Sequence, residues 1–120
     1  MQFNSPSSGL SVAADSSHHS LEAPRWDEQR RTLFVAGHKI KQFKQPAQSQ
    51  ELILIAFQED GWPVRIDDPL PPLAGKDQHA IKWRLRSTVE NLNRAQHGPI
   101  RVRFLLDGTG QGVCWSIVGD

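Results

Sequence analysis

The stretch DQHAIKWRLRSTVENLNRAQ, residues 77–96, decides the fold. Its apolar residues Ile81, Leu85, Val89 and Leu92 recur at helical spacing, which places them on one face of an α-helix. Asp77 suits the N-terminus of such a helix, and Gly98 and Pro99 follow its end. The sequence therefore predicts a long amphipathic helix over residues 77–96, with one face buried in a core.

A second face of this predicted helix is basic. On a helical wheel, His79, Lys82, Arg86 and Asn93 fall together at about 100–160° from Ile81. Arg and Lys donate hydrogen bonds to guanine, and Asn pairs with adenine, so this stripe is typical of a helix that reads the major groove of DNA. The alternative is a solvated face of an ordinary surface helix.

A β-hairpin is predicted after this helix. Residues 100–106 and 113–118 have strand-like patterns, and the loop DGTGQG at residues 107–112 joins them. Arg101 and Arg103 lie two residues apart on the first strand and therefore share one face. We expect these two side chains, with Arg94 from the end of the helix, to contact phosphates.

Two further elements are predicted before the helix. Residues 31–43 alternate around Gly37, which indicates a hairpin with a tight turn; the lysines at positions 39, 41 and 44 are typical of a protected sheet edge. Ser49 is a suitable N-cap for a nearly all-apolar helix that includes Leu52–Phe57 and ends at Gly61. The isoleucines leave a strand as the alternative, but the cap and the polar residues 58–61 favour a helix.

Prolines interrupt the segment between the two predicted helices. Pro63, Pro69, Pro71 and Pro72 exclude a regular helix and allow at most a turn or short strand near Val64–Ile66. Charge also changes sign along the chain. Residues 25–50 and 76–106 are net basic, whereas residues 51–69 carry five acidic side chains against one arginine. The formal net charge of +1 therefore hides an asymmetric molecule.

Length and composition indicate one domain. The chain has 120 residues, of which 38% are hydrophobic. Residues 1–24 contain seven serines and no periodic apolar pattern, so we expect a disordered arm before a domain at residues 25–120. No apolar run is long enough to span a bilayer and no secretory signal pattern is visible, so we expect a cytoplasmic protein without membrane contact.

The sequence gives little support for an enzyme, a cofactor or a metal site. A single cysteine excludes an internal disulfide framework, and Cys114 is predicted to be a small core residue. The glycine-rich loop precedes a strand and lacks the Lys-Ser/Thr pair of a phosphate-binding loop. His18-His19 and Asp67-Asp68 are interpreted as solvated pairs. Trp83 either packs on the proline-rich connector or offers a stacking surface to a partner.

The order of elements resembles a winged helix. The similarity is to the C-terminal DNA-binding effector domains of OmpR/PhoB-type response regulators, and it covers about residues 26–118. It depends on LFVAG at 33–37, the helix at 50–61, the helix at 81–93 and DGTGQGV at 107–113. The resemblance implies an α+β winged helix-turn-helix-like fold with a recognition helix and a hairpin wing. The chain departs from the family where prolines replace the helix that normally crosses the DNA backbone.

These observations predict a non-enzymatic protein that binds double-stranded DNA and regulates transcription. The predicted contact residues are His79, Lys82, Arg86, Asn93, Arg94, Arg101 and Arg103. The alternative is a winged-helix module that binds another protein, or a second copy of itself, without binding DNA. The predicted core consists of Leu33, Val35, Leu52, Ile53, Ala56, Phe57, Ile81, Leu85, Val89, Leu92 and Val113.

Overall fold

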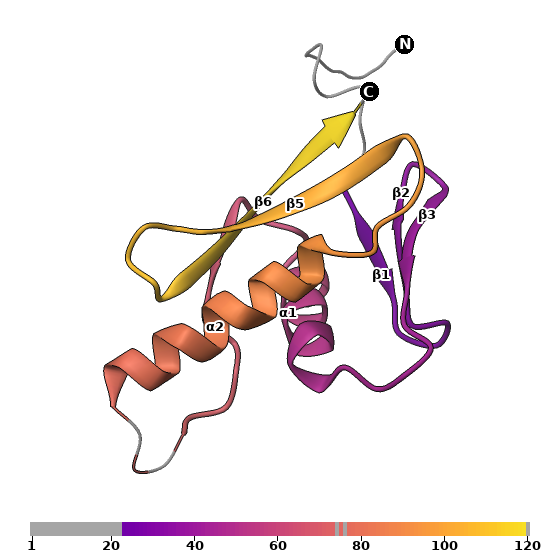
Figure 1. Cartoon of the computed structure of the whole chain (residues 1–120). Coiled ribbons are helices and arrows are strands. Elements are labelled where there is room, and N and C mark those ends of the chain that lie inside the picture. Colours follow the sequence, from indigo (N-terminus) through magenta and orange to yellow (C-terminus); the bar gives the residue numbers. More distant parts are fainter. Residues whose placement is uncertain (1–22, 74, 76, 120) are drawn as a thin grey trace, which may run out of the picture.

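The computed structural model describes residues 23–73, 75 and 77–119. These residues form a small α+β fold with two helices and two three-stranded antiparallel sheets (Figure 1). The predicted arm at residues 1–24 lies almost wholly outside the described residues. The α+β class and the order of strands, helix, connector, helix and hairpin are confirmed.

The first sheet has the order β1-β2-β3 and contains β1 (Arg25–Asp27), β2 (Thr32–Val35) and β3 (His38–Gln42). The predicted hairpin is β2 and β3, and it turns through Ala36 and Gly37, which have φ angles of 50° and 80°. Two successive positive φ angles are typical of a tight hairpin turn, which explains the glycine. The sequence did not indicate β1, which has only three residues and pairs with β2.

The second sheet has the order β4-β6-β5 and is built on the predicted C-terminal hairpin. Its strands are β4 (Arg65–Asp67), β5 (Ile100–Leu106) and β6 (Gly112–Gly119). β4 comes from the proline-rich connector and pairs with β6 between Arg65↔Cys114 and Asp67↔Gly112. The rest of the described connector contains neither helix nor strand, as the prolines predict.

Helix α1 (Gln48–Glu59) confirms the choice of helix over strand for the apolar stretch. The predicted N-cap was wrong, because the helix begins before Ser49 and its N-cap is Ala47. Arg31 and Glu51 explain this shift. The Glu51 carboxylate accepts a hydrogen bond from the Ala47 backbone N–H at 3.1 Å and pairs with Arg31 at 2.7 Å. The Glu51 carboxylate thus binds the backbone N–H of the N-cap residue, as the acidic residue of a capping box does, and no side chain at position 47 caps the first turn.

Helix α2 (Gln78–Asn93) has the predicted start, since the Asp77 side chain accepts a hydrogen bond from the Ala80 N–H. Its end was predicted three residues too late. The buried Lys41 of β3 explains the difference, because its ammonium donates to the carbonyls of Asn91 at 2.7 Å and Arg94 at 2.8 Å. A cation there also complements the negative end of the helix dipole. Lys41 therefore caps a helix and does not protect a sheet edge.

Replacing Lys41 with methionine is expected to lower the free energy of unfolding by about 1.5–3 kcal/mol, because charge-assisted hydrogen bonds to buried carbonyls are lost. Chemical denaturation of wild type and Lys41→Met measures the effect. Lys39→Met is the control, because Lys39 is exposed on the same strand and its replacement should change stability by less than about 0.5 kcal/mol. Equal stabilities of both variants would contradict the capping role.

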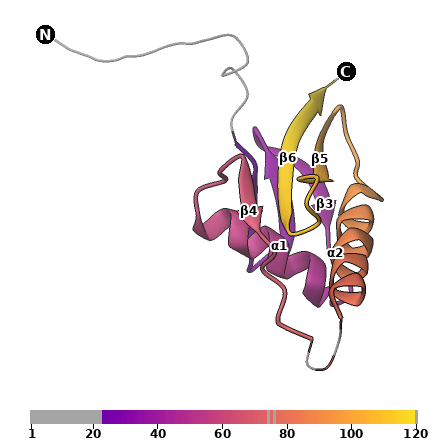
Figure 2. The ribbon, with the colours of Figure 1, turned by 90° about the vertical axis from the view of Figure 1, so that its left-hand side faces the viewer.

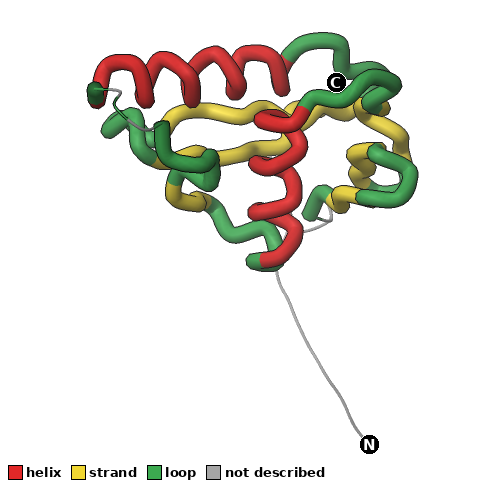
Figure 3. Tube along the Cα trace, turned by 90° about the horizontal axis from the view of Figure 1, so that it is seen from below, coloured by secondary structure: helices red, strands yellow, loops and turns green. Residues whose placement is uncertain are grey.

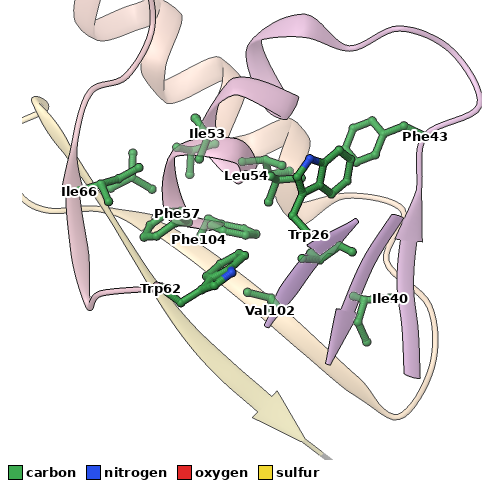
Figure 4. Close-up of a cluster of buried hydrophobic side chains, with 14 of the residues drawn as sticks. Trp26, Ile40, Phe43, Ile53, Leu54, Phe57, Trp62, Ile66, Val102 and Phe104 are labelled. Atoms are coloured by element: carbon green, nitrogen blue, oxygen red, sulfur yellow. The ribbon is translucent and has the colours of Figure 1, made fainter. Parts of the chain in front are cut away.

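One apolar core joins both sheets and both helices. Phe57 of α1, Trp62 and Phe104 of β5 lie together at its centre, with Phe57 and Trp62 stacked at 5.0 Å between ring centroids (Figure 4). The two helices run in different directions below the second sheet, and the first sheet lies to one side of α1 (Figures 1 and 3). Helix α2 lies alongside β5 on the side of the second sheet away from β4 (Figure 2). Eight of the predicted core residues are buried, whereas Leu52, Ala56 and Ile81 are half-buried.

Candidate nucleic-acid interface

Some basic side chains of the described residues form ion pairs or hydrogen bonds within the fold, and others form none. Arg31, Lys41, Arg65 and Arg84 each make a close ion pair or hydrogen bond within the fold. By contrast, no side-chain hydrogen bond or ion pair to another described residue is made by Lys39, Lys44, Lys82, Arg86, Arg101 and Arg103. The last four lie on α2 and β5, and they were all predicted to contact DNA.

On α2, His79, Lys82 and Arg86 are all exposed, as predicted. They line one wall of a hollow of about 440 Å³, together with Trp83. The opposite wall is the end of β5 and the β5–β6 loop, represented by Leu106, Gly108, Thr109 and Gly110. The structure therefore brings the N-terminal half of α2 and the glycine-rich loop into one site.

Trp83 is the largest apolar side chain on this surface, with 61% of its area exposed. The neighbouring Arg84 contacts the connector, donating to the carbonyl of Pro71 at 2.6 Å. Trp83 is therefore largely exposed, and its role as a stacking surface for a partner stays a prediction. Cys114 also differs from its prediction, because it is half-buried in β6 and not part of the core.

Asp107 fixes the shape of the loop. Its carboxylate accepts hydrogen bonds from the backbone N–H and the hydroxyl of Thr109, at 2.9 and 2.6 Å, and from Arg65 of β4 at 2.6 Å. The Thr109 hydrogen bonds, aided by Arg65, hold the pKa of Asp107 well below its usual range. A Cβ atom at Gly112 would collide with the Arg65 guanidinium, so a larger residue there would displace this arginine. The loop is thus held in a defined conformation.

Asn93 lies on the same stripe of α2 but has a different partner from the one predicted. Its amide donates to the Phe104 carbonyl at 2.9 Å and accepts from the Phe104 N–H at 2.8 Å. The Gln96 amide makes the same two bonds to Val102, at 2.7 and 2.9 Å. Both amides therefore pair with the outer edge of β5 as another strand would. Asn93 connects α2 to β5, and we do not include it in the proposed DNA-contacting set.

The two β5 arginines occupy the outward face of the second sheet. Arg101 and Arg103 are exposed and alternate with the buried Val102 and Phe104. They border a second, shallow hollow next to Val118. Arg94 is also exposed, but its guanidinium donates to the Asn91 side chain at 3.1 Å, so it is less free than the β5 pair.

Comparisons with known proteins found no relative of this chain. No family model, curated protein or solved structure matches the chain. Within the described residues, no helix is long and apolar enough to cross a membrane, and no group of three or more His, Cys, Asp or Glu side chains could hold a metal ion. The His18-His19 pair lies outside the described part of the chain.

Acid is expected to destabilise the fold. Hydrogen bonds from Arg31 lower the pKa of Glu51, and hydrogen bonds from Thr109 and Arg65 lower that of Asp107. The folded state therefore releases these protons more readily than the unfolded chain does, so stability falls as the pH drops below about 4.5. Melting temperatures between pH 3 and pH 7 measure this loss.

The control for this acid effect is Glu51→Gln. It should be less stable than wild type at pH 7 and lose less stability on acidification, because one of the titrating groups is gone. Parallel pH profiles for the two proteins would show that the Arg31–Glu51 pair does not contribute.

Proposed function

We propose that this protein is a non-enzymatic DNA-binding protein of the kind that regulates transcription. The observation that carries the proposal is the placement of Lys82, Arg86, Arg101 and Arg103. None of these four cations forms a side-chain hydrogen bond or ion pair with another described residue. They lie on α2 and β5, which are joined by the hydrogen bonds between Asn93 and Phe104. Cations that are free within the fold can neutralise phosphates without first breaking an internal contact.

In our proposal the four cations of α2 and β5 contact the same DNA, and this is supported by the hydrogen bonds that join the two elements. Asn93 lies on the same stripe as Lys82 and Arg86 and bonds to β5, so this stripe faces the side of α2 where the hairpin lies. From Lys82 to Arg86 the helix rises by about 6 Å. Phosphates repeat every 3.4 Å along one strand of duplex DNA, so this length matches roughly two nucleotides.

The winged-helix interpretation is part of this proposal. It is supported by the central helix followed by a long basic helix and a terminal hairpin, and by a short strand that adds to that hairpin. The fold lacks a helix between α1 and α2 in its described residues, so the usual second helix cannot cross the DNA backbone here. The hairpin loop and the β5 arginines take that positioning role in our proposal.

Arg86→Ala and Arg101→Ala test the proposal separately. Each is expected to flatten the slope of log affinity against log salt concentration by about 0.9, because one phosphate contact is lost. If Arg86 contacts a guanine instead, its loss costs about 1–3 kcal/mol on the preferred sequence. Fluorescence anisotropy with random duplex DNA at several salt concentrations measures both effects.

The matched control is Arg30→Ala. Arg30 is an exposed arginine in the turn between β1 and β2 of the first sheet, where its guanidinium lies 3.9 Å from the Asp27 carboxylate. Its loss should leave the slope unchanged. If wild type shows no salt-dependent affinity for DNA, or if both test variants bind as well as wild type, the DNA proposal fails. The surface would then be assigned to a protein partner.

A further inference from the structure

Binding to duplex DNA alone gives no role to the hollow between α2 and the β5–β6 loop. Lys82 and Arg86 lie in a recess with the loop opposite them, not on a free ridge of the helix. Lys82 lies against the loop so closely that a Cβ atom on Gly110 would be 3.1 Å from its Cδ atom. The recess has a volume of about 440 Å³, which is enough for one base, and Lys82 and Arg86 stay exposed at it, so they can still contact the phosphates of an adjoining duplex.

Trp83 adds a second observation. Its indole is 61% exposed at the same hollow, whereas Trp26 and Trp62 are buried in the core. In a duplex, the faces of the bases are stacked on one another, and a protein in the groove reaches only their edges. An exposed indole ring finds a matching face only on a base that has left the stack.

We infer that this hollow binds an unpaired base of DNA, stacked on Trp83, with the adjoining phosphates held by Lys82 and Arg86. This inference rests on the proposed DNA binding and names its substrate class: DNA that carries unpaired bases next to a duplex. The β5 arginines hold the duplex phosphates, and the hollow takes the first unstacked nucleotide.

The loop opposite Trp83 suits this role. Gly108 and Gly110 have φ angles of 97° and 79°, and neither presents a side chain to the hollow. The hydrogen bonds of Asp107 to Thr109 and Arg65 fix the loop before any ligand binds. A preformed wall reduces the conformational entropy lost on binding. Cations beside an aromatic platform form the combination that binds single strands without a sequence preference.

The test compares three fluorescein-labelled DNAs with equal numbers of phosphates: a blunt duplex, a duplex with a short thymine overhang, and a single strand. For the full-length chain at fixed salt, the overhang duplex is expected to bind about 5- to 150-fold more tightly than the blunt duplex. Trp83→Ala should abolish this preference and keep the salt slope, because no charge is removed. Trp83→Phe should keep most of the preference, because phenylalanine also stacks.

Val64→Ala is the control for the loss of an exposed apolar side chain, since Val64 is 75% exposed at another position. Melting curves confirm that the variants fold. The inference is overturned if wild type binds the blunt and overhang duplexes equally, or if Trp83→Ala keeps the preference for the overhang. In either case, salt-dependent binding to the blunt duplex would still support the proposed function. No salt-dependent binding to any of the three DNAs overturns both.

Discussion

Replacing Phe57 with alanine is expected to lower the free energy of unfolding by about 3–5 kcal/mol, the largest single effect on stability that the structure indicates. Phe57 is fully buried, stacks on Trp62 and lies 6.0 Å from Phe104 between ring centroids. Alanine would leave a cavity where the helix, the connector and the second sheet meet. A domain of this size has only about 5–15 kcal/mol to lose, so the variant is expected to be partly unfolded at 37 °C.

Urea denaturation of Phe57→Ala and Val64→Ala measures this effect. Val64 is 75% exposed, so its truncation should change stability by less than about 0.5 kcal/mol. Both changes remove apolar atoms, but only one removes them from the core. A loss below about 1 kcal/mol for Phe57→Ala would mean that the aromatic cluster does not hold α1 and the connector against the second sheet.

The sequence predicted the elements whose signals are local. The apolar period of α2, its Asp77 cap and the alternation of β5 are all read within a few residues, and they are confirmed. The end of α2 was not predictable in this way. It depends on Lys41, which is about 50 positions earlier in the chain and reaches the helix only through the fold. β1 has three residues and no local pattern, so only its pairing with β2 defines it.

The residues of the candidate site were likewise predictable where the signal is local and not where it depends on the tertiary structure. The wheel of α2 correctly placed His79, Lys82 and Arg86 on an exposed face. It could not distinguish Asn93 from them, because a hydrogen-bonding side chain on that face suits a strand edge as well as a base. The loop residues of the hollow were singled out only as a wing, since their proximity to Trp83 is a property of the tertiary structure. The exposure of Trp83 was left open, because indole rings occur in cores and on binding surfaces.

The largest functional effect is expected when Lys82, Arg86, Arg101 and Arg103 are all replaced with alanine. If each contacts one phosphate, the slope of log affinity against log salt concentration flattens by about 3.6, and affinity for duplex DNA at 0.1 M salt falls by roughly three to four orders of magnitude. The fold should remain, because none of the four side chains is buried or bonded to another described residue. Anisotropy titrations from low to high salt measure the slope, and melting curves check the fold.

Net charge alone would also weaken binding, and a second variant separates that effect from direct contact. Arg30, Lys39 and Lys44 are exposed cations on or beside the first sheet, and replacing all three with alanine removes nearly the same charge from elsewhere. Charges more than about 10 Å from the phosphates are largely screened at 0.1 M salt, so this control should lose little slope per charge removed. If the slope per charge falls equally in both variants, binding is a diffuse effect of net charge. If it falls mainly in the four-residue variant, α2 and β5 are the elements that contact DNA.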